Sequence, residues 1–263
     1  MTSRLTRAVT LLALVLLAAP MAAQTGFPKN GYYLGMGDSV AAGTGALPVT
    51  HGYVYLLYDH GAFGPKQEMA FANASIRGAR SWELRDAQVP EALCTEPVQR
   101  PTVVTITSGA NDFFRGDTDV VGIARRVAES VDRLLNNPAV SSPVLDPWTG
   151  DPCRPLEKVT ILVSNYYSIP HPDPAVAAQL DALLRGFDMA LRFWISQVPV
   201  PAGSRVAIVD LYTPSLGRQG LVTIERRDGF PGPDPWNFDP HPTNLGHAFI
   251  AREFERTWRS LPD

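Results

Sequence analysis

Short apolar runs alternate with longer amphipathic ones along most of this chain. Five runs rich in β-branched residues predict strands buried on both faces, as in a parallel sheet: residues 32–37, 68–74, 102–109, 158–167 and 205–212. Apolar residues at helical spacing predict helices at residues 53–63, 81–93, 119–137, 174–198 and 243–258. In the second helix we expect Ser81 to be the cap and Pro90 to interrupt the pattern. The alternation predicts a three-layer α/β domain with right-handed crossovers.

Two connections are long for a compact domain. Residues 137–156 carry five prolines, and residues 217–240 are rich in Gly, Pro, Arg and Asp. Connections of this length favour functional loops over spacers. Because ligands of open α/β sheets sit beyond the carboxyl ends of the strands, the residues that follow each apolar run deserve the closest inspection.

The first residues resemble an export signal. Arg4 and Arg7 precede an apolar core of about a dozen residues, and small residues follow that core. The core is too short to cross a bilayer comfortably. We expect cleavage near Ala23, leaving residues 24–263 as a single domain that is secreted or periplasmic, without stable membrane insertion. An uncleaved anchor is the alternative.

Composition excludes some partners and predicts one covalent link. With 45% hydrophobic residues the chain can bury a sizeable core, whereas a net charge of −3 and the lack of a basic run argue against nucleic acid or anionic membrane. The only two cysteines, Cys94 and Cys153, predict one structural disulfide in an exported protein. A pair of free thiols is the alternative. We expect a monomer.

Polar clusters follow the predicted strands. Gly37-Asp38-Ser39 comes after the first, Asn73 and Gly78 after the second, Gly109, Asn111 and Asp112 after the third, and Asp239 and His241 precede the last helix. Together they supply a hydroxyl, a base, a carboxylate to orient that base and donors for an oxyanion. This is the set of groups that acyl transfer needs.

Each of these residues also has an ordinary structural explanation. A serine after a strand is often a helix cap, so Ser39 is either a cap or a nucleophile exposed by the turn at Gly37. Gly78 and Asn111 are common turn residues, or else donate a backbone and an amide N–H to the oxyanion. Their joint appearance at successive strand ends favours the catalytic interpretation.

The general base has to come from five histidines. His241 lies between two prolines just before a Thr-capped helix, with Asp239 two residues earlier, so a rigid loop holds an imidazole beside a carboxylate. A solvated Asp-His turn is the alternative. His51 and His60 lie in an amphipathic stretch and His247 inside the last helix, where packed or solvated side chains are expected.

This ordered set of blocks resembles the SGNH hydrolases, also called the GDSL esterase/lipase family. The blocks are Gly37-Asp38-Ser39, Gly78, Gly109-x-Asn111-Asp112 and Asp239-x-His241-Pro242, spread across nearly the whole mature chain. The resemblance implies a flavodoxin-like sheet of five parallel strands, with Ser39 as nucleophile, His241 as base, and an oxyanion hole from the N–H groups of Ser39 and Gly78 and the side chain of Asn111. It implies no metal and no organic cofactor. The family hydrolyses esters of lipids, acylated sugars and simple alcohols, and some members are acyltransferases.

One spacing departs from the family pattern. The usual last block is Asp-x-x-His, but Phe238 stands three residues before His241, and Asp239 only two before. Asp239, a backbone carbonyl or Asp234 is then the group that orients the ring. The α/β-hydrolase layout is not supported, because the G-x-S-x-G elbow is absent around Ser39.

Two other functions compete with a serine esterase. A metallohydrolase would take ligands from His171, Asp173, Asp239 and His241, although further ligands at metal-type spacing are missing. A non-catalytic module would hold a glycan or lipid on aromatic side chains: Trp148, Tyr166, Tyr167, Trp236 and Phe238. Of the esters, we expect one with a short or medium acyl chain.

Overall fold

Five parallel strands form the centre of the molecule. A computed structural model describes residues 31–94, 100–222 and 239–262, and the predicted signal peptide lies outside them. Within these ranges the strands are β1 (Tyr32–Gly37), β2 (Ala70–Asn73), β3 (Val103–Thr107), β4 (Thr160–Ser164) and β5 (Arg205–Val209), in the order β2-β1-β3-β4-β5. The predicted parallel α/β sheet is confirmed. The order reverses between β1 and β3, where β1 pairs with β3 from Tyr33 opposite Val103 to Gly37 opposite Thr107.

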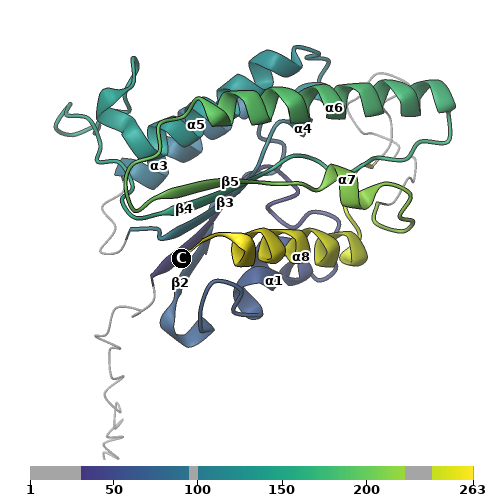
Figure 1. Cartoon of the computed structure of the whole chain (residues 1–263), viewed down its shortest axis with the longest axis horizontal. Helices are drawn as coiled ribbons and strands as arrows, with labels where there is room; N and C mark the ends of the chain where they lie inside the picture. Colours follow the sequence, from purple (N-terminus) through teal and green to yellow (C-terminus); the bar gives the residue numbers. More distant parts are fainter. Residues whose placement is uncertain (1–30, 95–99, 223–238, 263) are drawn as a thin grey trace, which may run out of the picture.

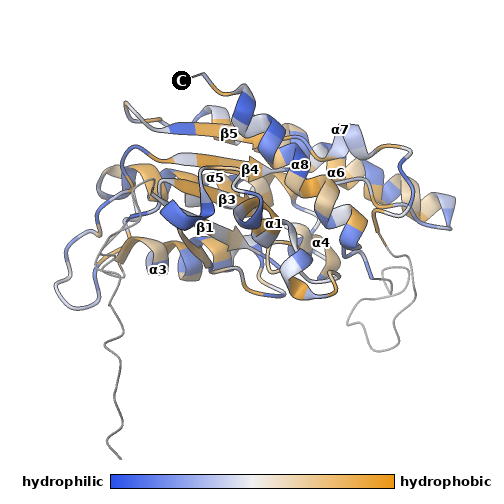
Figure 2. Cartoon of the chain, turned by 90° about the horizontal axis from the view of Figure 1, so that it is seen from below, coloured by the Kyte–Doolittle hydropathy of each residue, from blue (hydrophilic) through white to orange (hydrophobic). Residues whose placement is uncertain are grey.

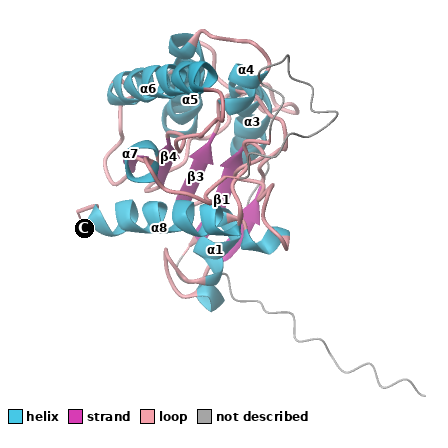
Figure 3. Ribbon diagram, turned by 90° about the vertical axis from the view of Figure 1, so that its right-hand side faces the viewer, coloured by secondary structure: helices cyan, strands magenta, loops and turns pink. Residues whose placement is uncertain are grey.

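Helices cover both faces of the sheet (Figures 1 and 3). One face carries α1 (Tyr53–Asp59) and α8 (Asn244–Ser260), and the other carries α3 (Val89–Cys94), α5 (Val120–Asn136) and α6 (Pro174–Ser196). Three short helices follow strands or loops: α2 (Ser81–Glu83), α4 (Ala110–Phe114) and α7 (Tyr212–Ser215). No helix in the described ranges is long and apolar enough to cross a membrane.

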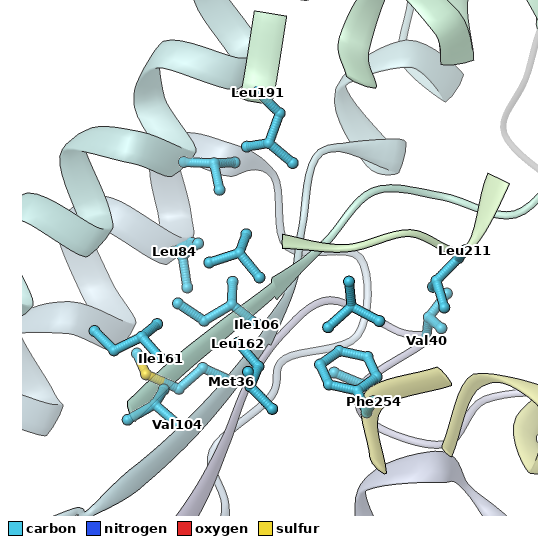
Figure 4. Packing of buried hydrophobic residues seen from close by; sticks show 14 of the residues in the cluster. Met36, Val40, Leu84, Val104, Ile106, Ile161, Leu162, Leu191, Leu211 and Phe254 are labelled. Atoms are coloured by element: carbon cyan, nitrogen blue, oxygen red, sulfur yellow. The ribbon is translucent and has the colours of Figure 1, made fainter. Parts of the chain in front are cut away.

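Burial explains the strand sequences. Every residue of β3 and β4 is buried, and the visible ribbon of β4 is mostly orange, the hydrophobic colour, in Figure 2. Met36, Val104, Ile106 and Ile161 interlock above the sheet in Figure 4. The edge strands β2 and β5 are mostly half-buried, so the expectation of five strands buried on both faces is wrong for these two: each has a neighbour on one side only.

The helical segment after β2 differs from the prediction in two ways. Ser81 is not the cap but the first helical residue, because its N–H and hydroxyl donate to Asp112 instead (2.8 and 2.9 Å). Pro90 does not end the segment: a π-helical turn, Leu84–Gln88, precedes it, and Val89 N–H bonds to Leu84 O. The wider turn gives room for a proline ring that an α-helix would not accommodate.

The long connection at residues 137–156 is held by a disulfide and one buried amide. Cys94, at the end of α3, is bonded to Cys153, as predicted. The fully buried Asn137 donates to the carbonyls of Val144 and Cys153 and accepts from Val144 N–H, at 2.7 to 2.8 Å. This connection leads into β4, so it lies at the amino ends of the strands. It is therefore remote from the edge where ligands of such sheets bind.

His247 joins the last helix to the turn after β1. It is fully buried; Nδ1 accepts from Tyr53 N–H (3.3 Å), and Nε2 donates to Thr44 O (2.9 Å). Thr44 N–H in turn donates to Ser39 O (2.9 Å). Burial is the main cause that lowers the pKa of His247, to about 4. The ring is therefore neutral and acts as both donor and acceptor.

We predict that this histidine makes folding sensitive to acid. Between pH 6.5 and 4 the unfolded chain binds a proton at His247 that the folded chain excludes, so stability falls as pH falls. The free energy of unfolding of wild type minus that of His247→Gln, from urea titrations, is expected to drop by about 3 kcal/mol between pH 7 and pH 4. Titrating groups shared by both proteins cancel in this difference. A difference independent of pH would contradict the prediction.

Candidate active site

Gly37 sets the geometry at the end of β1. Its φ is +126°, and a Cβ there would lie 2.0 Å from the carbonyl oxygen of Thr107 on β3, so only glycine fits. The next N–H, of Asp38, donates to that same oxygen (2.9 Å). The chain then leaves the sheet in a tight turn with Ser39 at its start.

Ser39 contacts a histidine from the other end of the chain. Its Oγ lies 2.8 Å from Nε2 of His241, 202 positions away in sequence. The hydroxyl has no bond to a backbone N–H in the described part of the chain, and residues 39–45 form turns rather than a helix. The alternative in which Ser39 is a helix cap is therefore wrong.

Asp239 meets His241 in spite of the short spacing. One carboxylate oxygen, Oδ1, lies 2.5 Å from Nδ1 of the ring and accepts the backbone N–H of His241 at 3.1 Å. Tyr167 O–H donates to Pro240 O (2.8 Å) between them, and Thr243 caps α8 by accepting Gly246 N–H (3.1 Å). A local turn thus brings the carboxylate and the imidazole together although only one residue separates them. Asp234, the other carboxylate considered for this position, lies outside the described residues.

The loop after β2 brings Gly78 toward the same end of the sheet. Ile76 N–H, two residues before Gly78, donates to Gly37 O (3.0 Å), and Asn111 Nδ2 donates to Ala79 O (2.9 Å). Among the described residues, the N–H groups of Ser39 and Gly78 have no acceptor. Two backbone donors without an acceptor therefore lie on the turn after β1 and the loop after β2, and the Asn111 amide on α4 bonds to that loop with one N–H and has a second N–H to donate.

Three buried polar residues around the turn form contacts that the sequence analysis did not predict. Gln88, from the π-helical turn, pairs its amide with both Gly37 N–H and Gly37 O, each at 2.8 Å. Tyr166 O–H donates to Asp38 Oδ2 at 2.5 Å. Asp112 accepts from Ser81 and forms an ion pair with Arg126 (3.2 Å). Each of these residues is polar and lies either on an otherwise apolar helix face or just after a buried strand. That position is the sequence signal that could have indicated a buried hydrogen bond.

Asp38 is a buried carboxylate beside Ser39. Desolvation raises its pKa to about 6, against the lowering effect of the bonds from Tyr166 and from Val40 N–H (2.9 Å). Because the pKa is raised on folding, protonation of Asp38 stabilises the fold as pH falls below 6. The ionised form costs about 3 kcal/mol at pH 7.

The residues suggested as metal ligands are engaged in other interactions. His171 Nδ1 accepts Asp173 N–H (3.0 Å), and the Asp173 carboxylate caps α6 through Ala175 N–H (2.8 Å). Across residues 31–94, 100–222 and 239–262, no group of three or more His, Cys, Asp and Glu is arranged to hold a metal ion.

Of the aromatics suggested for ligand stacking, the three in the described ranges do not form one surface. Tyr166 and Tyr167 are buried with their hydroxyls bonded inside the protein, and Trp148 is 92% exposed on the connection at the opposite end of the strands. Trp236 and Phe238 lie outside the described residues.

Solved structures share this fold at low sequence identity. A member of the lipolytic protein G-D-S-L family from Veillonella parvula is 14% identical, with a TM-score of 0.56 over 88% of this chain and 99% of its own. A carbohydrate esterase family 3 protein from Talaromyces cellulolyticus is 15% identical (TM-score 0.54, 87% and 96% covered). An extracellular lipase from Streptomyces rimosus is also 15% identical (TM-score 0.52, 86% and 99% covered). No curated protein matches the sequence.

A family model covers most of the chain. The model of the GDSL-like lipase/acylhydrolase family matches residues 36–249, which include every polar cluster at the strand ends. The fold and this match agree with the resemblance noted in the sequence. The chain therefore belongs to the GDSL-like lipase/acylhydrolase family and is a carboxylic ester hydrolase.

Proposed function

We propose that this enzyme is an exported serine esterase that works through an acyl-enzyme on Ser39. The observation that carries the proposal is the continuous chain of contacts from Ser39 Oγ to His241 Nε2 (2.8 Å) and from His241 Nδ1 to Asp239 (2.5 Å). A nucleophile within hydrogen-bond reach of a base, itself oriented by a carboxylate, is the arrangement used in acyl transfer.

In the first half-reaction His241 Nε2 takes the Ser39 proton as Oγ bonds to the ester carbonyl carbon. The N–H groups of Ser39 and Gly78 and the amide of Asn111 stabilise the resulting oxyanion. Collapse breaks the bond to the alcohol, which leaves with the proton from His241. The ester bond is now to Ser39.

The second half-reaction repeats these roles with water. His241 removes a proton from water as its oxygen attacks the acyl carbon, and returns that proton to Ser39 Oγ as the acid departs. No step requires a metal or an organic cofactor. We propose a short or medium acyl chain on a simple alcohol, sugar or lipid.

Replacing Ser39 by Ala is expected to remove nearly all turnover of p-nitrophenyl esters. A series of acyl lengths run with wild type gives the preferred chain length, and circular dichroism checks that the variant is folded. Stoichiometric labelling of wild type by an alkyl phosphonate, and none of the variant, would identify the nucleophile. Turnover that survives in folded Ser39→Ala would reject the mechanism.

Asp239→Asn tests whether the short spacing still provides an orienting carboxylate. The amide retains the shape but cannot stabilise the imidazolium, and a comparable change in a serine triad lowers kcat about 10⁴-fold. We expect a loss of kcat of at least about 10²-fold with little change in KM. An Asp239→Asn enzyme with most of its kcat would instead favour a carbonyl or Asp234.

Export is proposed from the basic and apolar start of the chain and supported by the Cys94–Cys153 disulfide, which suits an oxidising compartment. Protein recovered outside the cytoplasm is expected to begin near residue 24 by mass spectrometry and to carry no free thiol. An intact residue 1 on all of the exported protein would point to the uncleaved anchor.

A further inference from the structure

One buried hydroxyl connects the ends of β1 and β3, which carry two of the three proposed oxyanion donors. Tyr166 follows β4 and is 2% exposed. Its hydroxyl donates to Asp38 Oδ2 (2.5 Å) and accepts the N–H of Ala110 (2.9 Å). Burial and the nearby Asp38 raise the pKa of Tyr166 well above its usual range, so the proton stays on the phenol and the carboxylate is the acceptor.

Both partners of this hydroxyl are sequence neighbours of the reacting groups. Asp38 precedes Ser39, and its other oxygen accepts Val40 N–H (2.9 Å), so the carboxylate fixes the backbone on both sides of Ser39. Ala110 is the first residue of α4 and precedes Asn111. The Tyr166 hydroxyl thus links the Ser39 turn to the helix that carries Asn111.

We propose that Tyr166 is a positioning residue, which sets the distance between the Ser39 N–H and the Asn111 amide in the oxyanion hole. The inference rests on the proposed function. A hydroxyl bonded on both sides holds the two donors at one separation before substrate arrives. Two weaker constraints would remain without this hydroxyl: the bond from Asp38 N–H to Thr107 O, three residues before Ala110, and the separate contacts of the β1 end and of α4 with the Gly78 loop.

The arrangement favours positioning over a purely structural role. The Tyr166 ring already packs against Phe187 and Tyr167, with centroids 5.8 and 6.5 Å away, and these contacts do not need the hydroxyl. Its acceptor, Asp38, is an ionised group whose burial opposes folding. The ionisable side chains that interact with Asp38 are His241, Tyr53, Tyr166 and Tyr167.

Tyr166→Phe removes only the hydroxyl, and Tyr33→Phe is its matched control. Tyr33 is equally buried; it lies near the amino end of β1, and its hydroxyl contacts Thr105 Oγ1 (2.9 Å) in the middle of β3 rather than Asp38 or α4. We expect Tyr166→Phe to lower kcat roughly 10- to 100-fold with KM within about threefold, because small misplacements of catalytic groups have effects of this size. Tyr33→Phe is expected to leave both unchanged.

Inhibitor binding separates the oxyanion hole from ground-state binding. An alkyl boronic acid forms a tetrahedral adduct with serine, so its Ki is expected to rise in Tyr166→Phe by about the factor that kcat/KM falls. The Ki of the free carboxylic acid product is expected to stay the same. Equal losses for both ligands would overturn the inference and indicate general disruption of the pocket.

A double-mutant cycle with Asn111→Ala tests whether Tyr166 acts through the spacing of the donors. Tyr166→Phe is expected to cost less than about threefold once Asn111 is absent, whereas independent effects would multiply. The same loss in both backgrounds would overturn the inference. If Tyr166→Phe does not fold, Asp38→Asn takes its place in the cycle, with the same expected coupling.

The failure of this inference can be told apart from the failure of the proposed function. Activity that survives Ser39→Ala rejects the proposed function itself. If Ser39→Ala is inactive but Tyr166→Phe has the kcat of wild type, only this inference is rejected.

Discussion

The close approach of β1 to β3 at Gly37 is the constraint on which the rest of the site depends. The backbone at Gly37 runs so near the Thr107 carbonyl that no side chain fits, and the next N–H bonds to that carbonyl. With no side chain in the way, Gln88 reaches both polar groups of the Gly37 backbone, and Ile76 shares its carbonyl. Contacts with the backbone of Gly37 and Asp38 therefore position three elements: the turn that bears Ser39, the loop that bears Gly78 and the helix that bears Gln88.

Polar contacts in the interior, rather than apolar packing alone, align the ends of the elements around this point. His247 ties α8 to the turn, Asp112 ties α4 to Ser81 and Arg126, and Asp38 ties Tyr166 to Ser39's neighbours. Hydrogen bonds are directional where dispersion contacts are not, so they specify the angle at which an element ends. Burying the ionised Asp38 costs free energy, and in return its hydrogen bonds fix the direction in which the chain leaves β1.

Local pattern was sufficient for the sheet and for most of the site. All five strands and the cap at Thr243 follow from periodicity and residue type, and the places of Ser39 and His241 at strand and helix boundaries made them the candidates that the structure brings together. The roles of Gln88 and Tyr166 depend on partners 51 and 128 positions away, which no local window contains. Ser81 was misjudged for the same reason, because its partner Asp112 lies on another helix. The contact between Asp239 and His241 depends on the geometry of a local turn, which cannot be predicted from their spacing in sequence.

The 202 positions between Ser39 and His241 have a consequence for biosynthesis. On the proposed mechanism the nucleophile is synthesised early and its base 202 residues later, so no nascent chain that ends before His241 holds a complete set of reacting groups. On that mechanism, hydrolysis begins only after α8 has docked against α1. The time at which esterase activity appears therefore reports when folding is complete.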